Sequence, residues 1–567
     1  MLNSGSLISA AINEITLNMR FKFPLLILPI LILGCGSQKP VPEAAIESIT
    51  AEDMKNHIAV LASDEFLGRF PGTEGEEKTI NYLAEQFRLV GLKPANGDSW
   101  FQEVPLLRLT SDPAKSLLIT GGKASISLSS LVDFVGWSPQ TSEQITIENS
   151  PLVFVGYGIN APEFGWNDYE GIDVKGKTVL MLVNDPGYAT SDTSLFHGRA
   201  MTIYGRWTYK FEEAARQGAR AAVIVHETGA AAYPWSVVVN SWSGSNYSLA
   251  GNSLSRSDLQ VQGWITTESA GKIFESAGLD YKKMIASAAG RGFRAVDMKM
   301  KASVSFSNQA INVTSNNVAG VLQGSKRPDE YIIYTAHWDH FGVNPSISGD
   351  SIFNGALDNA TGTAALIELA QAFISLPKKQ DRSILFLAVT GEEQGLLGSR
   401  HYAANPLYPL DKTVGVINMD ALNITGKTKD IAIIGLGMSD LDEYMTGVLE
   451  KYGRYATPDP FAEQGGFFRS DHLSFAEAGV PVLYPSSGVD DVERGIEWGK
   501  AESDRFIARH YHKPSDNYNP GEWRFDGMIE DIRVFFETGY LLSMTDEFPG
   551  WKPGSPYLKL REEMMKE

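Results

Sequence analysis

At residues 331–339 the chain reads Tyr331-Ile332-Ile333-Tyr334-Thr335-Ala336-His337-Trp338-Asp339, an apolar run that ends at polar residues. Its β-branched and aromatic residues predict a buried strand. Similar runs cover residues 383–389, 414–418 and 480–484, and a helical pattern covers residues 361–375. Strands that alternate with helices favour a parallel sheet with crossover helices. We therefore expect an α/β fold, with a mixed, mostly parallel sheet flanked by helices.

Polar residues follow these runs where the predicted strands end. The carboxyl ends of neighbouring parallel strands meet at one crevice, so residues far apart in the sequence can converge there. Two histidines and a group of carboxylates in one crevice suit a pair of zinc ions, with cobalt or manganese as substitutes, and this predicts hydrolysis. The residues that we expect to bind the two ions are His337, Asp358, Glu393, Asp420 and His512.

Asp358 is the natural bridge between the two ions, because two dications repel each other until negative oxygen lies between them. The other ligands would divide into two pairs, His337 with Asp420 and Glu393 with His512. Three carboxylates and two neutral imidazoles would leave a net charge of about +1 on the pair of ions, which is enough to hold hydroxide.

Two further acids are predicted to act in catalysis. Glu392 is adjacent to the ligand Glu393, so in an extended stretch it points the other way, toward water. It is our candidate general base, which takes a proton from the attacking water and returns it to the leaving amine. Asp339 could accept the free N–H of the His337 ring and fix its tautomer.

Several other residues are interpreted as structural. We assign no metal ion to His340, His510 or His472, although all three lie near predicted site residues, and we expect His472 in the pocket wall. The tryptophans of the middle segment are expected to pack in a core or a loop. They are Trp207, Trp235 and Trp242.

The composition sets limits on domain number and partners. The chain has 567 residues, of which 43% are hydrophobic and 21% charged, and its net charge is −19. This length suggests two or three domains. The acidic balance and the lack of a basic stretch argue against a nucleic-acid partner and indicate a soluble surface. The sequence leaves the oligomeric state open.

The pattern of residues 111–310 differs from the rest, with short alternating runs and many turns, and predicts a mainly β insert. Within it we expect strands at residues 176–183 and 218–225 and a helix at 211–217. Helices are expected at residues 49–67 and 73–90. The expected divisions are 49–110 and 311–548 for the two parts of the α/β domain, 111–310 for the insert, and 549–567 for a C-terminal tail.

Residues 1–35 carry the features of an export signal. Arg20 and Lys22 precede the apolar residues 25–33, a run too short to span a membrane. Ile32-Leu33-Gly34-Cys35 resembles the lipobox of bacterial lipoproteins, so we expect a start at Met19, a lipid on Cys35 and a tether at 36–48. We therefore expect a cell-envelope lipoprotein. Because Gly36 is not aspartate, we expect it in the outer membrane, facing the periplasm. The alternative is an ordinary signal peptide on a soluble periplasmic or secreted protein.

These motifs resemble the co-catalytic zinc exopeptidases, which include bacterial leucyl aminopeptidases and, more distantly, glutamate carboxypeptidase and the transferrin receptor. The resemblance implies the fold of that family, two zinc ions on the five ligands named above, Glu392 as base, and a cis peptide after Asp358. The insert resembles a protease-associated domain. The matching stretches lie at residues 67–73, 336–340, 354–362, 391–399, 418–420, 470–472 and 511–514.

The leading interpretation is an aminopeptidase that acts on peptides. One rival is a carboxypeptidase or dipeptidase, which needs a basic clamp for the free carboxylate of its substrate. A second rival is glutaminyl cyclase, which shares the fold with one zinc ion, and a third is a non-catalytic binding lipoprotein. The candidates for the clamp are Arg69, Arg206, Arg400 and Arg469.

Overall fold

The structure is a computed structural model that describes residues 41–112, 116–242, 244–251 and 259–566. The predicted signal peptide, the start at Met19 and the lipid on Cys35 concern residues that lie outside these ranges. Of the expected tether, the described part includes a short helix, α1 (Glu43–Glu47), with Ala45 buried. Within the described ranges, no helix combines the length and apolar character needed to cross a membrane.

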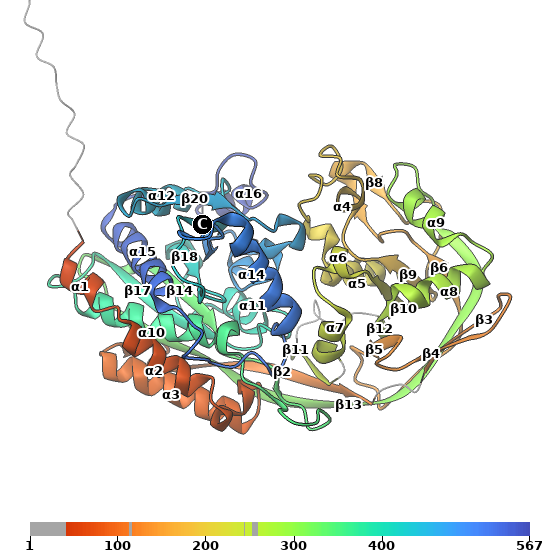
Figure 1. Ribbon diagram of the computed structural model, residues 1–567, viewed down its shortest axis with the longest axis horizontal. Helices are drawn as coiled ribbons and strands as arrows, with labels where there is room; N and C mark the ends of the chain where they lie inside the picture. Colours follow the sequence, from red (N-terminus) through yellow and green to blue (C-terminus); the bar gives the residue numbers. More distant parts are fainter. Residues whose placement is uncertain (1–40, 113–115, 243, 252–258, 567) are drawn as a thin grey trace, which may run out of the picture. The chain divides into compact units, whose positions relative to one another are not determined.

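The central sheet confirms the predicted α/β arrangement (Figure 1). Four strands run parallel in the order β17 (Arg382–Val389), β14 (Arg327–His337), β18 (Thr413–Asn418) and β21 (Val482–Ser487). The sheet is mixed because β13 (Val296–Leu322) pairs antiparallel with β17, and β19 (Asp430–Ile434) pairs antiparallel with β21. His337 is the last residue of β14, so the predicted site starts at the carboxyl edge of the sheet.

Helices cover both faces of this sheet, because successive residues of each strand point to opposite sides. Ile332 and Tyr334 belong to the core on one face, whereas Ile333 belongs to the core on the other. The first core is closed by α2 (Ala51–Leu61), α3 (Glu74–Val90), α10 (Thr361–Ile374) and α15 (Phe525–Met544). The second is closed by α11 (Leu397–Ala404) and α13 (His472–Glu477), which supply Tyr402 and Phe475.

The N-terminal helices differ in part from the prediction. α3 covers the expected residues and ends at Gly91, which has a φ of 103° that suits glycine. The helix expected over residues 49–67 ends instead at Leu61, and the 3-10 turn η1 (Asp64–Arg69) follows it. Leu67 and Gly68 adopt positive φ values there, which an α-helix does not allow.

The middle segment has its own sheet and its own cores. β6 (Gln144–Phe154), β9 (Thr178–Leu182), β10 (Ala221–His226) and β12 (Val261–Thr266) are parallel neighbours. Two apolar clusters, containing Phe154 and Trp264 respectively, are built almost wholly from this segment. It carries more helix than expected, including α5 (Trp207–Arg216), α7 (Trp235–Trp242) and α8 (Thr267–Ser276). The boundaries at 111 and 310 stay a prediction.

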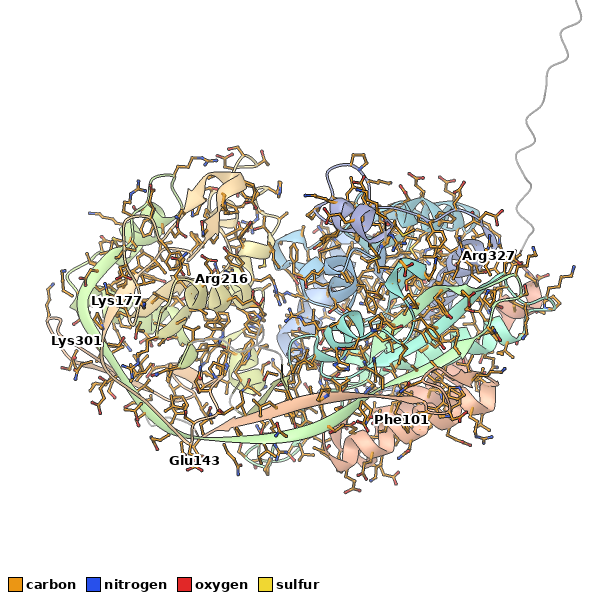
Figure 2. The ribbon with its side chains drawn as sticks, turned by 180° about the vertical axis from the view of Figure 1, so that it is seen from behind. Phe101, Glu143, Lys177, Arg216, Lys301 and Arg327 are labelled. Carbon is orange, nitrogen blue, oxygen red and sulfur yellow. The ribbon has the colours of Figure 1, made fainter. Side chains whose placement is uncertain are left out.

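Two long strands connect the insert to the central sheet. β2 (Phe101–Ser111) pairs with the second half of β13, and the first half of β13 pairs with β6 and with β3 (Ser116–Thr120). Figure 2 shows this continuous path, with Phe101 labelled on β2 and Lys301 on β13. The insert is therefore joined to the central sheet by hydrogen-bonded strand pairing as well as by the covalent connections of the chain.

Candidate metal centre

The structure brings all five predicted ligands to one place. His337 ends β14, Asp358 lies in the turn before α10, Glu393 follows β17 and Asp420 follows β18. The fifth, His512, comes after α14 (Ile496–Arg509) and adopts a positive φ of 53°. The predicted convergence at the carboxyl edge of parallel strands therefore accounts for three of these positions, and a helix and a turn supply the other two.

Asp358 lies between the two histidines. Its Oδ1 is 3.3 Å from His337 Nε2, and its Oδ2 is 3.4 Å from His512 Nε2. On the first side, Asp420 Oδ1 is 3.4 Å from His337 Nε2. On the second side, Glu393 Oε2 is 3.1 Å from His512 Nε2. The five side chains thus form two groups of three that share one aspartate.

These separations and this donor set fit a pair of zinc ions. Two donors bound at about 2.0–2.1 Å to one tetrahedral ion lie about 3.3 Å from each other. The four nitrogen–oxygen distances in the cluster, 3.1–3.4 Å, match that spacing. The side chains are only 1–15% exposed, so the carboxylates are withdrawn from water and need a positive partner.

The pKa shifts of the site residues also indicate that the carboxylates need a positive partner. Burial works against charge on Asp358, yet hydrogen bonds from His337 and His512 hold its pKa well below the usual range. Burial also works against charge on His512, but Glu393 and Asp358 outweigh it and raise the pKa to about 9. Protons on the histidines therefore compensate the acids here, which is the role that divalent cations can take.

Glu392 lies beside this cluster, with Oε2 4.0 Å from His337 Nε2. Burial raises its pKa well above the ordinary value of a glutamate, and Glu393 and Asp420 act in the same direction against His337. Asp339 behaves differently from the prediction. Its main-chain oxygen, at 3.2 Å, is closer to His337 Nδ1 than its carboxylate at 3.9 Å, and Oδ1 instead accepts the N–H of Glu392 at 3.1 Å.

His340, to which we assigned no metal ion from the sequence, lies in the cluster. His340 Nδ1 is 2.6 Å from Glu393 Oε1, and its ligand atom groups with those of Asp358 and Glu393. The sequence signal for a place of His340 in the site was its position one residue after Asp339. His472 was expected in the pocket wall, but it is fully buried against Phe467 and Tyr484 and does not line the pocket beside the cluster, and burial lowers its pKa to about 3.

Comparison with known proteins shows a likeness to one family over part of the chain. The sequence profile described as Peptidase family M28 matches residues 317–535, which contain all five predicted ligands. We call residues 317–535 the M28 segment because of this similarity. The cis peptide between Asp358 and Asn359, which the resemblance implied, is present in this M28 segment.

Several characterised or named proteins are similar to parts of the chain. Aminopeptidase YwaD of Bacillus subtilis (strain 168) is 30% identical over 227 residues, which are 39% of this chain and 42% of that protein. A probable zinc metalloprotease of Pyrenophora tritici-repentis (strain Pt-1C-BFP) is 36% identical over 111 residues, 19% of this chain and 24% of that protein. The chain therefore spans less than half the length of these curated relatives.

A solved structure supports the fold over a longer range. The aminopeptidase from Aneurinibacillus sp. strain AM-1 superposes on 89% of this chain and 97% of its own, with a TM-score of 0.53 and 19% identity. The likeness thus extends well beyond the M28 segment.

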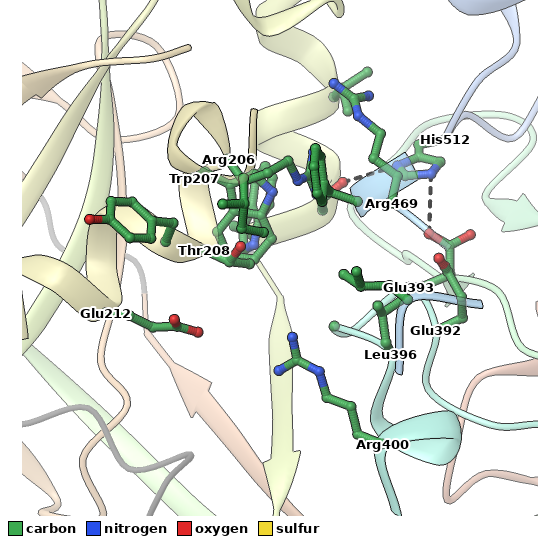
Figure 3. A pocket seen from close by; sticks show the side chains of 18 of the residues that line it. Arg206, Trp207, Thr208, Glu212, Glu392, Glu393, Leu396, Arg400, Arg469 and His512 are labelled. Carbon is green, nitrogen blue, oxygen red and sulfur yellow. Dashed lines mark hydrogen bonds and ion pairs between the residues drawn. The ribbon is translucent and has the colours of Figure 1, made fainter. Parts of the chain in front are cut away.

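The insert contacts the M28 segment at the metal cluster. Ser241 Oγ in α7 lies 3.3 Å from His512 Nδ1, and Asn240 Nδ2 donates to the His512 main-chain oxygen at 3.0 Å. A pocket of about 170 Å³ opens here, and Figure 3 shows Glu392, Glu393 and His512 in its wall. Trp207 and Trp242, which we expected to pack in a core or a loop, pack against the core of the insert and also line this pocket.

Two buried residues hold the loop that carries Asp358. Asp516 accepts the N–H groups of Leu357 and Asp358 at 3.0 and 3.1 Å, and nothing in the sequence signalled this role. Arg69 is 1% exposed and donates to four main-chain oxygens, which belong to Leu61, Trp338, Asn354 and Gly355. Arg69 therefore fixes the loops that carry these four oxygens and is not free to clamp a substrate.

We expect Arg69→Met to lower the free energy of unfolding by about 3 kcal/mol, because four buried carbonyl oxygens lose a charged donor. Denaturant unfolding measures this change. Arg88→Met is the control, since Arg88 is exposed on α3 and pairs with the exposed Glu85, and its unfolding midpoint should stay close to that of the unchanged protein. Equal midpoints in both variants would contradict the structural role of Arg69.

Proposed function

We propose that this chain is a zinc-dependent exopeptidase, most specifically an aminopeptidase that removes N-terminal residues from peptides, with two zinc ions per chain. The observation that carries the proposal is the pair of Asp358 oxygens, each 3.3–3.4 Å from the histidine of a different ligand group. The names of the relatives, an aminopeptidase and a probable zinc metalloprotease, support the same chemistry.

His337, Asp358 and Asp420 would hold one ion, and Asp358, Glu393 and His512 the other. Bound zinc would lower the pKa of the attacking water and polarise the carbonyl group of the substrate. Glu392 accepts the proton of that water and passes it to the leaving amine. Asp339 keeps Glu392 in place through the N–H contact at 3.1 Å. His340 Nδ1, 2.6 Å from Glu393 Oε1, orients the carboxylate of that ligand.

The reaction is tested with matched chromogenic substrates on the zinc-loaded protein. An aminopeptidase should hydrolyse an aminoacyl anilide with a free α-amine and leave its N-acetylated form intact. Hydrolysis of an N-acetylated peptide with a free C-terminal carboxylate, together with no hydrolysis of the aminoacyl anilide, would favour the carboxypeptidase alternative. A protein that binds no zinc and hydrolyses none of these substrates would instead support the binding lipoprotein.

Export as a lipoprotein remains part of the proposal, and it rests on residues 20–36 of the sequence. The expected product is a chain that begins at Cys35 and carries a lipid, facing the periplasm. Mass spectrometry of the mature N-terminus tests this, and an unlipidated N-terminus would favour the soluble periplasmic or secreted form.

We expect Ser241→Ala to weaken zinc binding by about 10–100-fold, the usual effect of losing a residue that orients a ligating histidine. Ser241 Oγ contacts His512 Nδ1 at 3.3 Å, and this contact helps to hold the imidazole ring in the orientation that binds zinc. Competition with a chelator measures the affinity. Ser236→Ala in the same helix is the control, because Ser236 is exposed. Unchanged affinity in Ser241→Ala would contradict the prediction.

A further inference from the structure

Three arginines line the pocket that contains Glu392, Glu393 and His512. Arg206 comes from the insert, just before α5, whereas Arg400 lies in α11 and Arg469 lies just before α13. Figure 3 shows all three around the same space. In each of them Nε is buried and has no hydrogen-bond partner. The same pocket is also lined by the glutamates Glu212, Glu392, Glu393 and Glu477, so its wall carries both charges.

Acids lie near these arginines without pairing with them directly, and Arg469 is close enough to Asp459 to oppose the rise in the pKa of that carboxyl on burial. Among the described residues, none of the three guanidinium groups has a carboxylate oxygen within 4.0 Å. Glu477 in the pocket wall is close enough to Arg400 for that arginine to lower the pKa of Glu477 against the effect of burial. Arg206 has a like charge as its strongest neighbour: burial and then Arg469 lower its pKa to about 9, and the weaker attraction of Glu392 does not restore it.

Arg469 is held in a fixed orientation by the insert. Its Nη2 donates to the Ala231 main-chain oxygen at 3.1 Å, and its guanidinium carbon lies 5.5 Å from the centroid of the Tyr233 ring. A guanidinium that is already fixed loses less conformational freedom when it pairs with a carboxylate, and its planar donors match the two oxygens of that group. A buried pair of like charges is stabilised when an anion binds between them.

We propose that Arg206 and Arg469 form a carboxylate-binding subsite beside Glu392, so that the preferred substrates are peptides with a carboxylate within about one residue of the scissile bond. The substrate statement rests on the proposed exopeptidase function. Glu392 and the two arginines line the same pocket of about 170 Å³, so a substrate bound at Glu392 has the arginines in the wall around it. The carboxylate can belong to an acidic side chain or to a free C-terminus.

The first experiment compares kcat/KM for peptides that differ only in charge. The pairs are Leu-Glu-NH2 with Leu-Gln-NH2, Glu-Ala-NH2 with Gln-Ala-NH2, and Leu-Ala with Leu-Ala-NH2. The first two pairs report a side-chain carboxylate after or before the scissile bond, and the third reports a free C-terminus. At least one acidic member should be preferred by about tenfold or more, the scale of a hydrogen bond to a charged group.

The variants then assign the preference to the two arginines. Arg206→Met and Arg469→Met should remove most of the preference while kcat/KM for the neutral member changes little. Arg216→Met is the matched control, since Arg216 is about half exposed on α5 of the same insert and pairs with Glu213. Its preference should equal that of the unchanged protein. Equal kcat/KM for acidic and neutral members, or a preference that survives both variants, would overturn the proposal.

A binding experiment separates this proposal from the proposed function. Calorimetry of the zinc-loaded protein with glutarate and with its diamide, glutaramide, needs no hydrolysis. Glutarate should bind more tightly than the diamide, and the double variant Arg206→Met with Arg469→Met should weaken it by about tenfold or more. If no peptide is hydrolysed but glutarate binding depends on the arginines, the subsite stands and the exopeptidase function fails. Binding that is unchanged in the double variant overturns the subsite.

Discussion

Glu392→Gln is expected to lower kcat by about 10²–10⁴, the usual contribution of a general base, while both metal ions stay bound. Glutamine keeps the size of the side chain but cannot accept a proton. Glu392 is buried, it lies 4.0 Å from His337 Nε2, and Asp339 holds its N–H, so its orientation should survive the change. The loss should therefore fall on the proton transfer and leave the substrate affinity nearly unchanged.

Steady-state kinetics and zinc content by atomic emission decide the role of Glu392 together. Glu450→Gln is the control, because Glu450 is an exposed residue of α12 (Leu441–Lys451) and its kinetics should match those of the unchanged protein. A fall in zinc content along with kcat would identify Glu392 as a ligand, in the group that it forms with His337 and Asp420. A normal kcat would contradict the role of Glu392 as the general base.

Asp358→Asn is expected to have the other large effect, the loss of both metal ions and of activity by about 10³-fold or more. The two Asp358 oxygens face His337 and His512 at 3.3 and 3.4 Å, so this one side chain serves both ligand groups. An amide offers one neutral oxygen, and two dications close together would then repel each other with less negative charge between them.

The measurement is zinc content after dialysis against a weak chelator, followed by activity after zinc is added back. Asp504→Asn is the control, since Asp504 is exposed on α14, the helix that leads to His512, and it should retain the metal. Retention of two ions in Asp358→Asn would show that the aspartate does not bridge. Retention of one ion would assign it to a single group.

Local sequence patterns were enough to predict the strands and most residues of the metal centre. The run at residues 331–336 predicted β14, and the runs at 383–389 and 414–418 predicted β17 and β18 nearly residue for residue. They succeeded because buried parallel strands are continuous apolar runs that end sharply at polar residues. The helix expected over residues 49–67 was too long, because positive φ values at Leu67 and Gly68 carry little signal in composition.

The sequence by itself determined the α/β class and the three ligands that follow strands, because the ends of parallel strands converge at one edge of the sheet. Only the tertiary structure decided which other residues reach that edge. His340 against Glu393, Asp516 beneath the Asp358 loop, and Ser241 against His512 all depend on how loops fold over long sequence separations. The pairing of Arg206 with Arg469 is of the same kind: it requires the insert to pack on the M28 segment, and no periodicity within either segment encodes that contact.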